Sequence, residues 1–172
     1  QNIVIRVVPN DGFAGGYAIQ STPFSLANDH FVSALAQQNI RSGHTAVLFD
    51  GKMYVWGGES TSGELLNTMD IYDLRSGVWS RGKSGGTARK HHTASVFSGK
   101  IYFFGGEGAF SRLATLDVFD INEQSWSEAA FSPTARRGHS ATLYNGKIYV
   151  WGGFGFQGEM NTLDVYDIES NQ

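Results

Sequence analysis

Short apolar segments, most with small and large side chains in alternation, are separated by glycine-containing turns along much of the chain. HTAVLF (44–49) is followed by the pair Asp50-Gly51 and then by KMYVW (52–56), which leads into two glycines. An alternation with a period of two residues is typical of a β-strand. An Asp-Gly pair between two such segments is typical of a tight hairpin. The pattern therefore predicts two antiparallel strands at about 44–49 and 53–57.

The same pattern occurs three times, and His44, His92 and His139 mark equivalent positions 48 and 47 residues apart. The repeated segments are RSGHTAVLFDGKMYVWGG from Arg41, RKHHTASVFSGKIYFFGG from Arg89 and RRGHSATLYNGKIYVWGG from Arg136. Each is followed by a third apolar segment: MDIYDL, LDVFDI or LDVYDI. We expect strands a to d at about 44–49, 53–57, 69–74 and 78–81, repeated 47 or 48 residues later, with essentially no helix. A repeat of about 50 residues built from short strands is typical of a β-propeller, in which each repeat forms one blade.

These positions resemble the kelch repeat. Its consensus has Arg and His ahead of strand a, a Gly doublet after strand b, Tyr-Asp in strand c and Trp in strand d. Here they are Arg41, His44, Gly57-Gly58, Tyr72-Asp73 and Trp79, and most recur in the next two units. The resemblance covers roughly residues 41–170. It implies an all-β fold, a kelch-type β-propeller forming a partial arc of about three to four four-stranded blades.

The repeat divides the chain into blades at 41–88, 89–135 and 136–172, the last without its fourth strand. We interpret residues 1–40 as a degenerate partial blade, strands b, c and d, because a 48-residue shift places Phe31 on Trp79 and Phe24 on Tyr72. A strand pair outside the repeat is the alternative. The chain begins at Gln1 without an initiator Met, so we expect a processed or excised chain. Since propellers typically close with about 4–8 blades, we expect a segment of a longer propeller, or association with other chains through exposed blade edges.

Composition excludes several classes of protein. Charged residues make up 17% and the net charge is −3, so no polybasic surface points to nucleic acid or anionic lipid. The chain has no Cys, which removes disulfides and thiolate catalysis. No apolar run approaches the ~20 residues of a membrane helix, so we expect no membrane span. The compartment is left open.

The repeated polar residues do not predict catalysis, a metal or a cofactor. Imidazole suits several transition metals, but the three histidines share one repeat position, which fits hydrogen bonds to the backbone of a neighbouring blade better than a ligand set. An acid–base pair needs two carboxylates in unlike environments, whereas the aspartates recur in every unit, at 70, 117 and 164 and at 73, 120 and 167.

The kelch resemblance implies that the Arg ahead of strand a and the residue after the Gly doublet line one face around the axis. This loop face also carries the b–c segments 59–68, 107–115 and 154–162, which vary between repeats. The predicted binding residues are Arg41, Arg89, Arg136, Glu59, Glu107 and Phe154, with Phe110 and Phe156 as apolar anchors. An Arg fork suits a carboxylate ligand. The alternative of equal weight is that each Arg tethers its own blade to the next.

These observations favour a binding module whose loop face holds a protein, peptide or glycan. One alternative is a carbohydrate-active kelch enzyme of the sialic-acid mutarotase type, which the resemblance would equip with Arg89, Arg136, Glu59 and Glu107 in a central pocket. Another is a structural component of an assembly. A copper-dependent galactose oxidase of the kelch type is disfavoured, because its cofactor needs a Cys.

Overall fold

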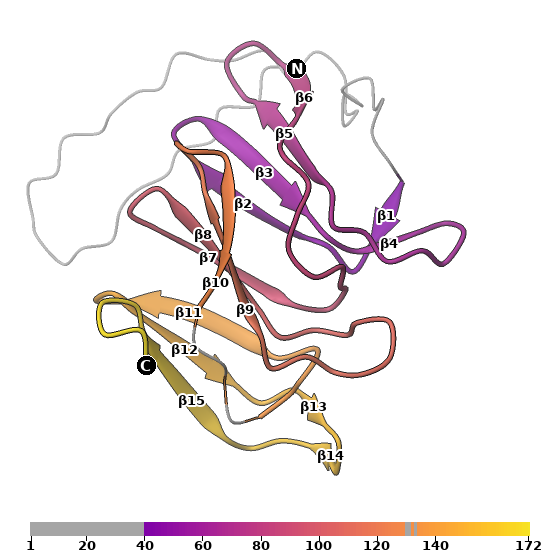
Figure 1. The fold of residues 1–172 in the computed structure, drawn as a ribbon, viewed down its shortest axis with the longest axis vertical. Coiled ribbons are helices and arrows are strands. Elements are labelled where there is room, and N and C mark those ends of the chain that lie inside the picture. The colour runs from indigo at the N-terminus through magenta and orange to yellow at the C-terminus, as the bar shows by residue number, and fades with distance from the viewer. Residues whose placement is uncertain (1–39, 130–131, 133) are drawn as a thin grey trace, which may run out of the picture. The chain divides into compact units, whose positions relative to one another are not determined.

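The computed structural model describes residues 40–129, 132 and 134–172, which belong to a compact unit spanning residues 36–172 (Figure 1). The expected partial blade at 1–40 lies outside the described residues except for Ile40. The described residues form strands and turns and no helix, so the prediction of an all-β chain is confirmed.

Three antiparallel sheets follow one another along the chain. The first has the order β2-β3-β5-β6, the second β7-β8-β9-β10 and the third β11-β12-β15. Their strands are β2 (Thr45–Phe49), β3 (Lys52–Trp56), β5 (Met69–Asp73), β6 (Val78–Arg81), β7 (Thr93–Phe97), β8 (Lys100–Phe104), β9 (Leu116–Asp120), β10 (Ser125–Glu128), β11 (Ser140–Tyr144), β12 (Lys147–Trp151) and β15 (Leu163–Asp167). The strands of the first sheet agree with the predicted ranges to within one residue. The sheets lie inside the expected blades, whose boundaries stay predictions.

The a–b hairpins close with the turns that the sequence indicates. Asp50-Gly51, Ser98-Gly99 and Asn145-Gly146 all have positive φ, 45° and 68° in the first pair. Two successive positive φ values match the right-handed twist of the flanking strands. Register follows from this: Phe49 pairs with Lys52 and Thr45 with Trp56.

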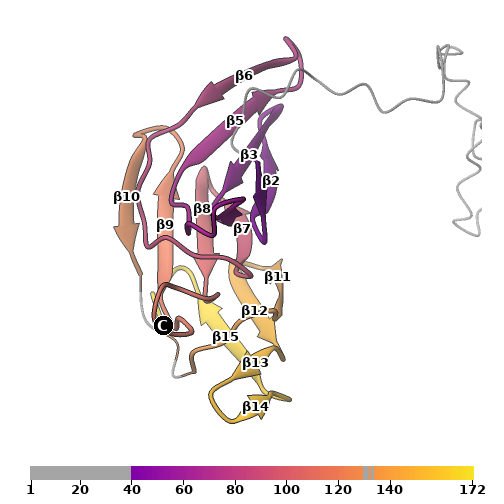
Figure 2. The ribbon, with the colours of Figure 1, turned by 90° about the vertical axis from the view of Figure 1, so that its right-hand side faces the viewer.

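The cores lie between the sheets. β7 contacts both β2 and β11, so the first strands of successive blades are neighbours, and Figure 2 shows the strands of the second sheet side by side. Alternate residues of β8 serve two cores, because successive side chains point to opposite faces. Ile101 and Phe103 pack against Trp56 of the first blade. Tyr102 and Phe104 belong to the cluster that holds Ile148 and Val150 of the third blade. Each buried side chain of this size contributes about 1.5–3 kcal/mol.

The Gly doublets let neighbouring blades meet. A methyl group on Gly57 would lie 2.7 Å from His92 Cε1, and one on Gly105 2.8 Å from His139 Cε1. Both glycines have positive φ, so conformation and space both demand Gly. We call each such contact region between blades a joint.

Candidate binding face

The repeated arginines lie inside the blades. Arg89 Nη2 donates to Asp117 Oδ2 over 2.5 Å, and its Nη1 donates to the carbonyls of Gly105 and Thr115. Arg136 makes the same ion pair with Asp164, and Arg41 with Asp70. Burial lowers the pKa of Arg89, and the charge of Asp117 opposes that shift. Each guanidinium thus braces the ends of strands b and c within its own blade.

The three arginine side chains that were predicted to bind a ligand are buried. The side chains of Arg41, Arg89 and Arg136 are 5%, 0% and 0% exposed, so in this structure a ligand has almost no guanidinium surface to contact. Their backbone carbonyls also serve the joints, since Gly58 N donates to Arg89 O and Gly106 N to Arg136 O over 2.8 Å. The guanidinium groups thus form hydrogen bonds within their own blades, and the hydrogen bonds with the preceding blade are made by the backbone carbonyls of Arg89 and Arg136.

The joint histidines bond a hydroxyl of the neighbouring blade. His92 Nε2 lies 2.8 Å from Thr45 Oγ1, and His139 Nε2 lies 2.9 Å from Thr93 Oγ1. These Nε2 partners are hydroxyl groups rather than the predicted backbone groups, because each ring crosses the joint beside the Gly doublet and reaches strand a; His139 in addition has a backbone hydrogen bond with Phe104 of the neighbouring blade. Burial, followed by the charge of the neighbouring Arg, lowers the pKa of His92 to about 3 and that of His139 to about 4. Both rings are therefore neutral at pH 7.

On the loop face, ion pairs cross the joints. Lys90 Nζ donates to Glu59 Oε1 and Arg137 Nη1 to Glu107 Oε2, both over 2.7 Å. His91 Nδ1 lies 3.9 Å from the same Glu107 oxygen. Sequence analysis predicted Glu59 and Glu107 on this face and missed their partners Lys90 and Arg137. A signal existed, since Ser42, Lys90 and Arg137 share the position after the repeated Arg.

The b–c segments are short hairpins rather than open loops. In the first blade Glu59 forms a bridge with Leu65 and Ser60 N donates to Glu64 O, while β4 (Glu59–Ser60) also pairs with β1 (Arg41–Ser42) ahead of strand a. In the third, β13 (Phe154–Gly155) pairs with β14 (Gly158–Glu159). In the second, Gly108 N donates to Ser111 O. Phe110 lies at this turn with its surface fully exposed, 102% of the reference value, and Phe156 is 70% exposed.

Two cations meet an aromatic side chain between the second and third blades. The guanidinium of Arg112 lies 5.0 Å from the ring centre of Phe154 and 5.6 Å from that of Phe156. The guanidinium of Arg137 lies 5.7 Å from the Phe154 ring. No described residue forms an ion pair or hydrogen bond with the Arg112 side chain, and its Nε is buried without a partner. Sequence analysis missed Arg112, which occurs in a single repeat.

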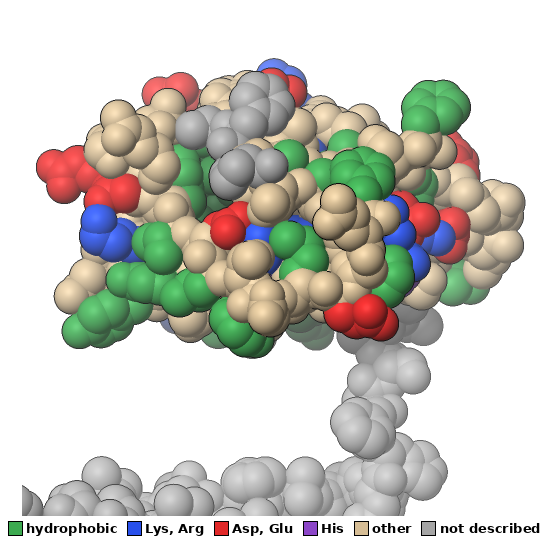
Figure 3. All heavy atoms as spheres, turned by 90° about the horizontal axis from the view of Figure 1, so that it is seen from below, with side chains coloured by type: hydrophobic (Ala, Val, Ile, Leu, Met, Phe, Trp, Pro, Cys, Tyr) green, Lys and Arg blue, Asp and Glu red, His purple; other side chains and the backbone are tan. Residues whose placement is uncertain are grey.

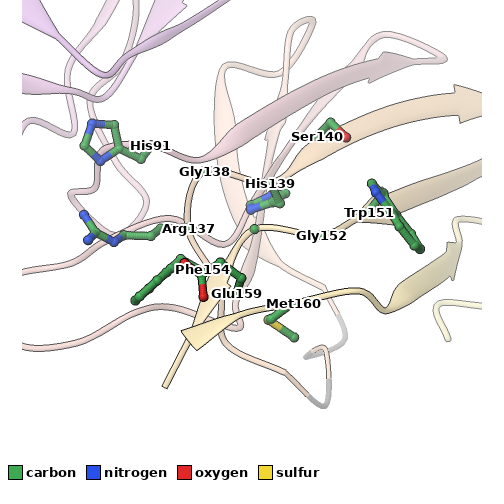
Figure 4. A pocket seen from close by; sticks show the side chains of 11 residues that line it. His91, Arg137, Gly138, His139, Ser140, Trp151, Gly152, Phe154, Glu159 and Met160 are labelled. Atoms are coloured by element: carbon green, nitrogen blue, oxygen red, sulfur yellow. The ribbon is translucent and has the colours of Figure 1, made fainter. Parts of the chain in front are cut away.

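Arg137 and Phe154 also line an open hollow of about 780 Å³ (Figure 4). His91, Arg137 and Phe154 lie at one side of it, and Trp151 lies at the other. The structure thus brings Glu107, Arg137, Arg112, Phe154 and Phe156 together at the second joint. Glu59 lies at the first joint with Lys90.

The Gly doublets, the Arg–Asp braces and the histidines at the joints define a segment of a kelch-type β-propeller. The chain belongs to the KLHDC2/KLHL20/DRC7 Kelch-repeats domain family, which matches residues 43–172. No curated protein matches the chain. Kelch-repeat domains are in general protein-interaction modules. Within the described residues, no helix is long and apolar enough to cross a membrane, and no cluster of three or more His, Asp or Glu is placed to hold a metal ion.

Proposed function

We propose that the chain is a protein-interaction module whose loop face, at the second joint, binds an acidic segment of a partner protein. The observation that carries the proposal is the unpaired Arg112 lying over Phe154 and Phe156. Arg112 and Arg137 approach the same ring, while Glu107 is the carboxylate bonded to Arg137 there. A partner carboxylate can accept two hydrogen bonds from the free fork of Arg112.

Exposed aromatic side chains supply the apolar part of the proposed contact. Phe110 and Phe156 lie on the b–c segments of adjacent blades and are both exposed. Phe110 is two residues before Arg112 in the sequence, and the ring of Phe156 lies beneath the Arg112 guanidinium. Aromatic and Arg side chains are enriched among residues that dominate binding energy. A segment that combines Asp or Glu with apolar residues therefore fits this surface better than a neutral glycan.

No observation on the described residues supports the mutarotase alternative. It needs Arg89 and Arg136 in an open pocket, whereas both guanidinium groups are fully buried in ion pairs with Asp117 and Asp164.

Selection from a random peptide library on the immobilised chain tests the proposal. We expect the selected peptides to be enriched in Asp and Glu, and Arg112→Ala to weaken their binding about 10-fold or more, as loss of a charge-assisted hydrogen bond of ~1.5–3 kcal/mol implies. Arg75→Ala is the matched control, because Arg75 is exposed on the c–d turn at the other end of the first blade. Selected peptides without acidic enrichment, or equal binding by Arg112→Ala, would contradict the proposal.

A further inference from the structure

His91 occupies a position at which the other two repeats have glycine. It aligns with Gly43 and Gly138, and Gly43, His91 and Gly138 all have positive φ, at 66°, 57° and 62°. This left-handed region is unfavourable for a residue with a Cβ atom, whereas glycine adopts it freely. The other non-glycine residues with positive φ in the described part of the chain lie in the turns that follow strands a and c. His91 is therefore strained at a place where glycine would serve.

The backbone around His91 imposes this conformation. His91 N donates to Gly43 O over 2.8 Å, and Gly138 N donates to His91 O over 2.9 Å. These two hydrogen bonds join the equivalent positions of the three blades. A methyl group on Gly43 would lie 3.0 Å from His91 Cδ2, so the imidazole packs against the backbone of the first blade. The hydrogen bonds use backbone atoms, so glycine could make them without strain. Strain of this kind is often found at functional sites.

The imidazole of His91 lies on the loop face, at the second joint. The side chain is 45% exposed, and the second blade has a described neighbour on each side. His91 Nδ1 lies 3.9 Å from Glu107 Oε2, the oxygen that accepts a hydrogen bond from Arg137 Nη1. Arg137 also lies over the ring of Phe154, which Arg112 approaches. His91 thus belongs to the same group of side chains as the proposed ligand contacts.

The charged groups around His91 form two pairs. Glu107 of its own blade bonds Arg137 of the third, and Lys90, the preceding residue, bonds Glu59 at the first joint. The first blade contributes backbone to this contact. Figure 3, which views the molecule from below Figure 1, shows Lys and Arg side chains beside Asp and Glu side chains on the side of the b–c hairpins. Because the charges within each pair cancel, a charge on the imidazole changes the net charge of the face.

We propose that His91 contacts the acidic segment of the partner protein and binds it more tightly when the imidazole is protonated. This inference rests on the proposed function, because it needs the acidic ligand of Arg112. A ligand carboxylate that approaches Arg112 and Arg137 is repelled by the carboxylate of Glu107. A protonated imidazole beside Glu107 offsets that repulsion and attracts the ligand.

Binding should therefore strengthen as the pH falls from 7.5 to 5.5. Histidine is the side chain whose charge ordinarily changes between pH 5 and 8, and the Asp and Glu side chains of a peptide stay mostly ionised at pH 5.5. The joint histidines cannot produce this effect. Burial lowers the pKa of His92 to about 3 and that of His139 to about 4, and acid that protonates them destabilises the fold.

Titration of one selected acidic peptide at pH 7.5 and 5.5 tests the inference. The affinity of the parent chain should rise about threefold, the usual effect of one exposed charge pair. His91→Gly and His91→Asn should show no rise, and the unfolding temperature of His91→Gly should equal or exceed that of the parent, because glycine relieves the strain. Ser98→Gly is the matched control, since Ser98 is exposed in the a–b turn of the same blade and also has positive φ, 48°. It should keep the affinity and the pH response of the parent.

Arg112→Ala separates this inference from the proposed function. It should weaken binding at both pH values and keep the rise at pH 5.5. A parent chain without the rise, His91 variants that keep it, or a lower unfolding temperature of His91→Gly would overturn the role of His91 while leaving that of Arg112 intact. Selected peptides without Asp or Glu would overturn both.

Discussion

Arg89 reaches three kinds of acceptor from inside the second blade: the carboxylate of Asp117, the carbonyls of Gly105 and Thr115, and the hydroxyl of Thr115. The five N–H donors of a guanidinium form a rigid fork, which explains why the repeat holds Arg here and not Lys. Asp117 is 1% exposed, so without the Arg its charge would be buried with no cation beside it. In this structure the guanidinium of Arg89 therefore serves as a brace of the second blade.

We predict that Arg89→Ala lowers the free energy of unfolding by about 3–5 kcal/mol, the usual loss when one partner of a buried ion pair is removed. Urea denaturation measures it. Arg75→Ala, on an exposed turn, should stay within about 0.5 kcal/mol of the parent chain. Unchanged stability together with weaker ligand binding would restore the ligand role of Arg89.

The histidines at the joints predict a dependence of stability on pH. The pKa of His92 is about 3 in the folded chain and about 6.5 in an unfolded one. The folded state therefore binds fewer protons between these values. Stability is complete above pH 6.5 and falls as the pH drops, approaching about 1.4 kcal/mol per pH unit for each such histidine.

His92→Gln should remove that share of the pH dependence between pH 6 and 4. The readout is the slope of the unfolding free energy against pH, compared with the slope for the parent chain. Replacement of the exposed His91 by Gln is the matched control. Equal slopes for the parent and His92→Gln would show that the ring is not held neutral at the joint.

At the scale of the element, the Gly doublet decides how close two sheets approach. Gly105 and Gly51 share a positive φ, 62° and 68°, but a methyl group on Gly105 would lie 2.8 Å from Arg136 O, whereas Gly51 has nothing within 4 Å. Comparing substitutions at the two glycines therefore separates the free-energy cost of the backbone conformation from the cost of a clash at the joint.

We predict that Gly105→Ala destabilises the chain more than Gly51→Ala. Both changes force alanine into the left-handed region at about 1–2 kcal/mol, and Gly105→Ala adds a clash that typically costs about 1–3 kcal/mol. Thermal or urea unfolding of the two variants gives the difference. Equal losses would mean that the blades can shift apart without penalty.

The strands were predictable because the features that set them are local and recur: the alternation, the turn pairs and the Gly doublets. The contacts of Arg89 were not, because an Arg at a repeated position suits an exposed ligand site as well as a buried brace. Lys90 with Glu59 and Arg112 with Phe154 join different repeats. Their pairing depends on how one blade is set against the next, which no single repeat reveals.

At the scale of the whole molecule, different parts of each repeat serve packing and recognition. The faces of the sheets that meet at the two joints are committed to packing, because Trp56, Phe103 and Phe104 are buried there. The b–c hairpins share the Gly doublet but differ beyond it, and at the second joint they bring Arg112, Phe154 and Phe156 together. Recognition of a partner is therefore expected at this joint on the loop face and not at the a–b or c–d turns.

Titration of one selected acidic peptide into paired variants tests this account most directly. Arg112→Gln should weaken binding at least about 10-fold, the equivalent of about 1.4 kcal/mol, and the remaining affinity should depend less on salt because one charge pair is gone. Its unfolding temperature and the affinity of Arg75→Gln should match the parent chain. Undiminished affinity of a fully folded Arg112→Gln would contradict the proposal that the second joint is the binding site.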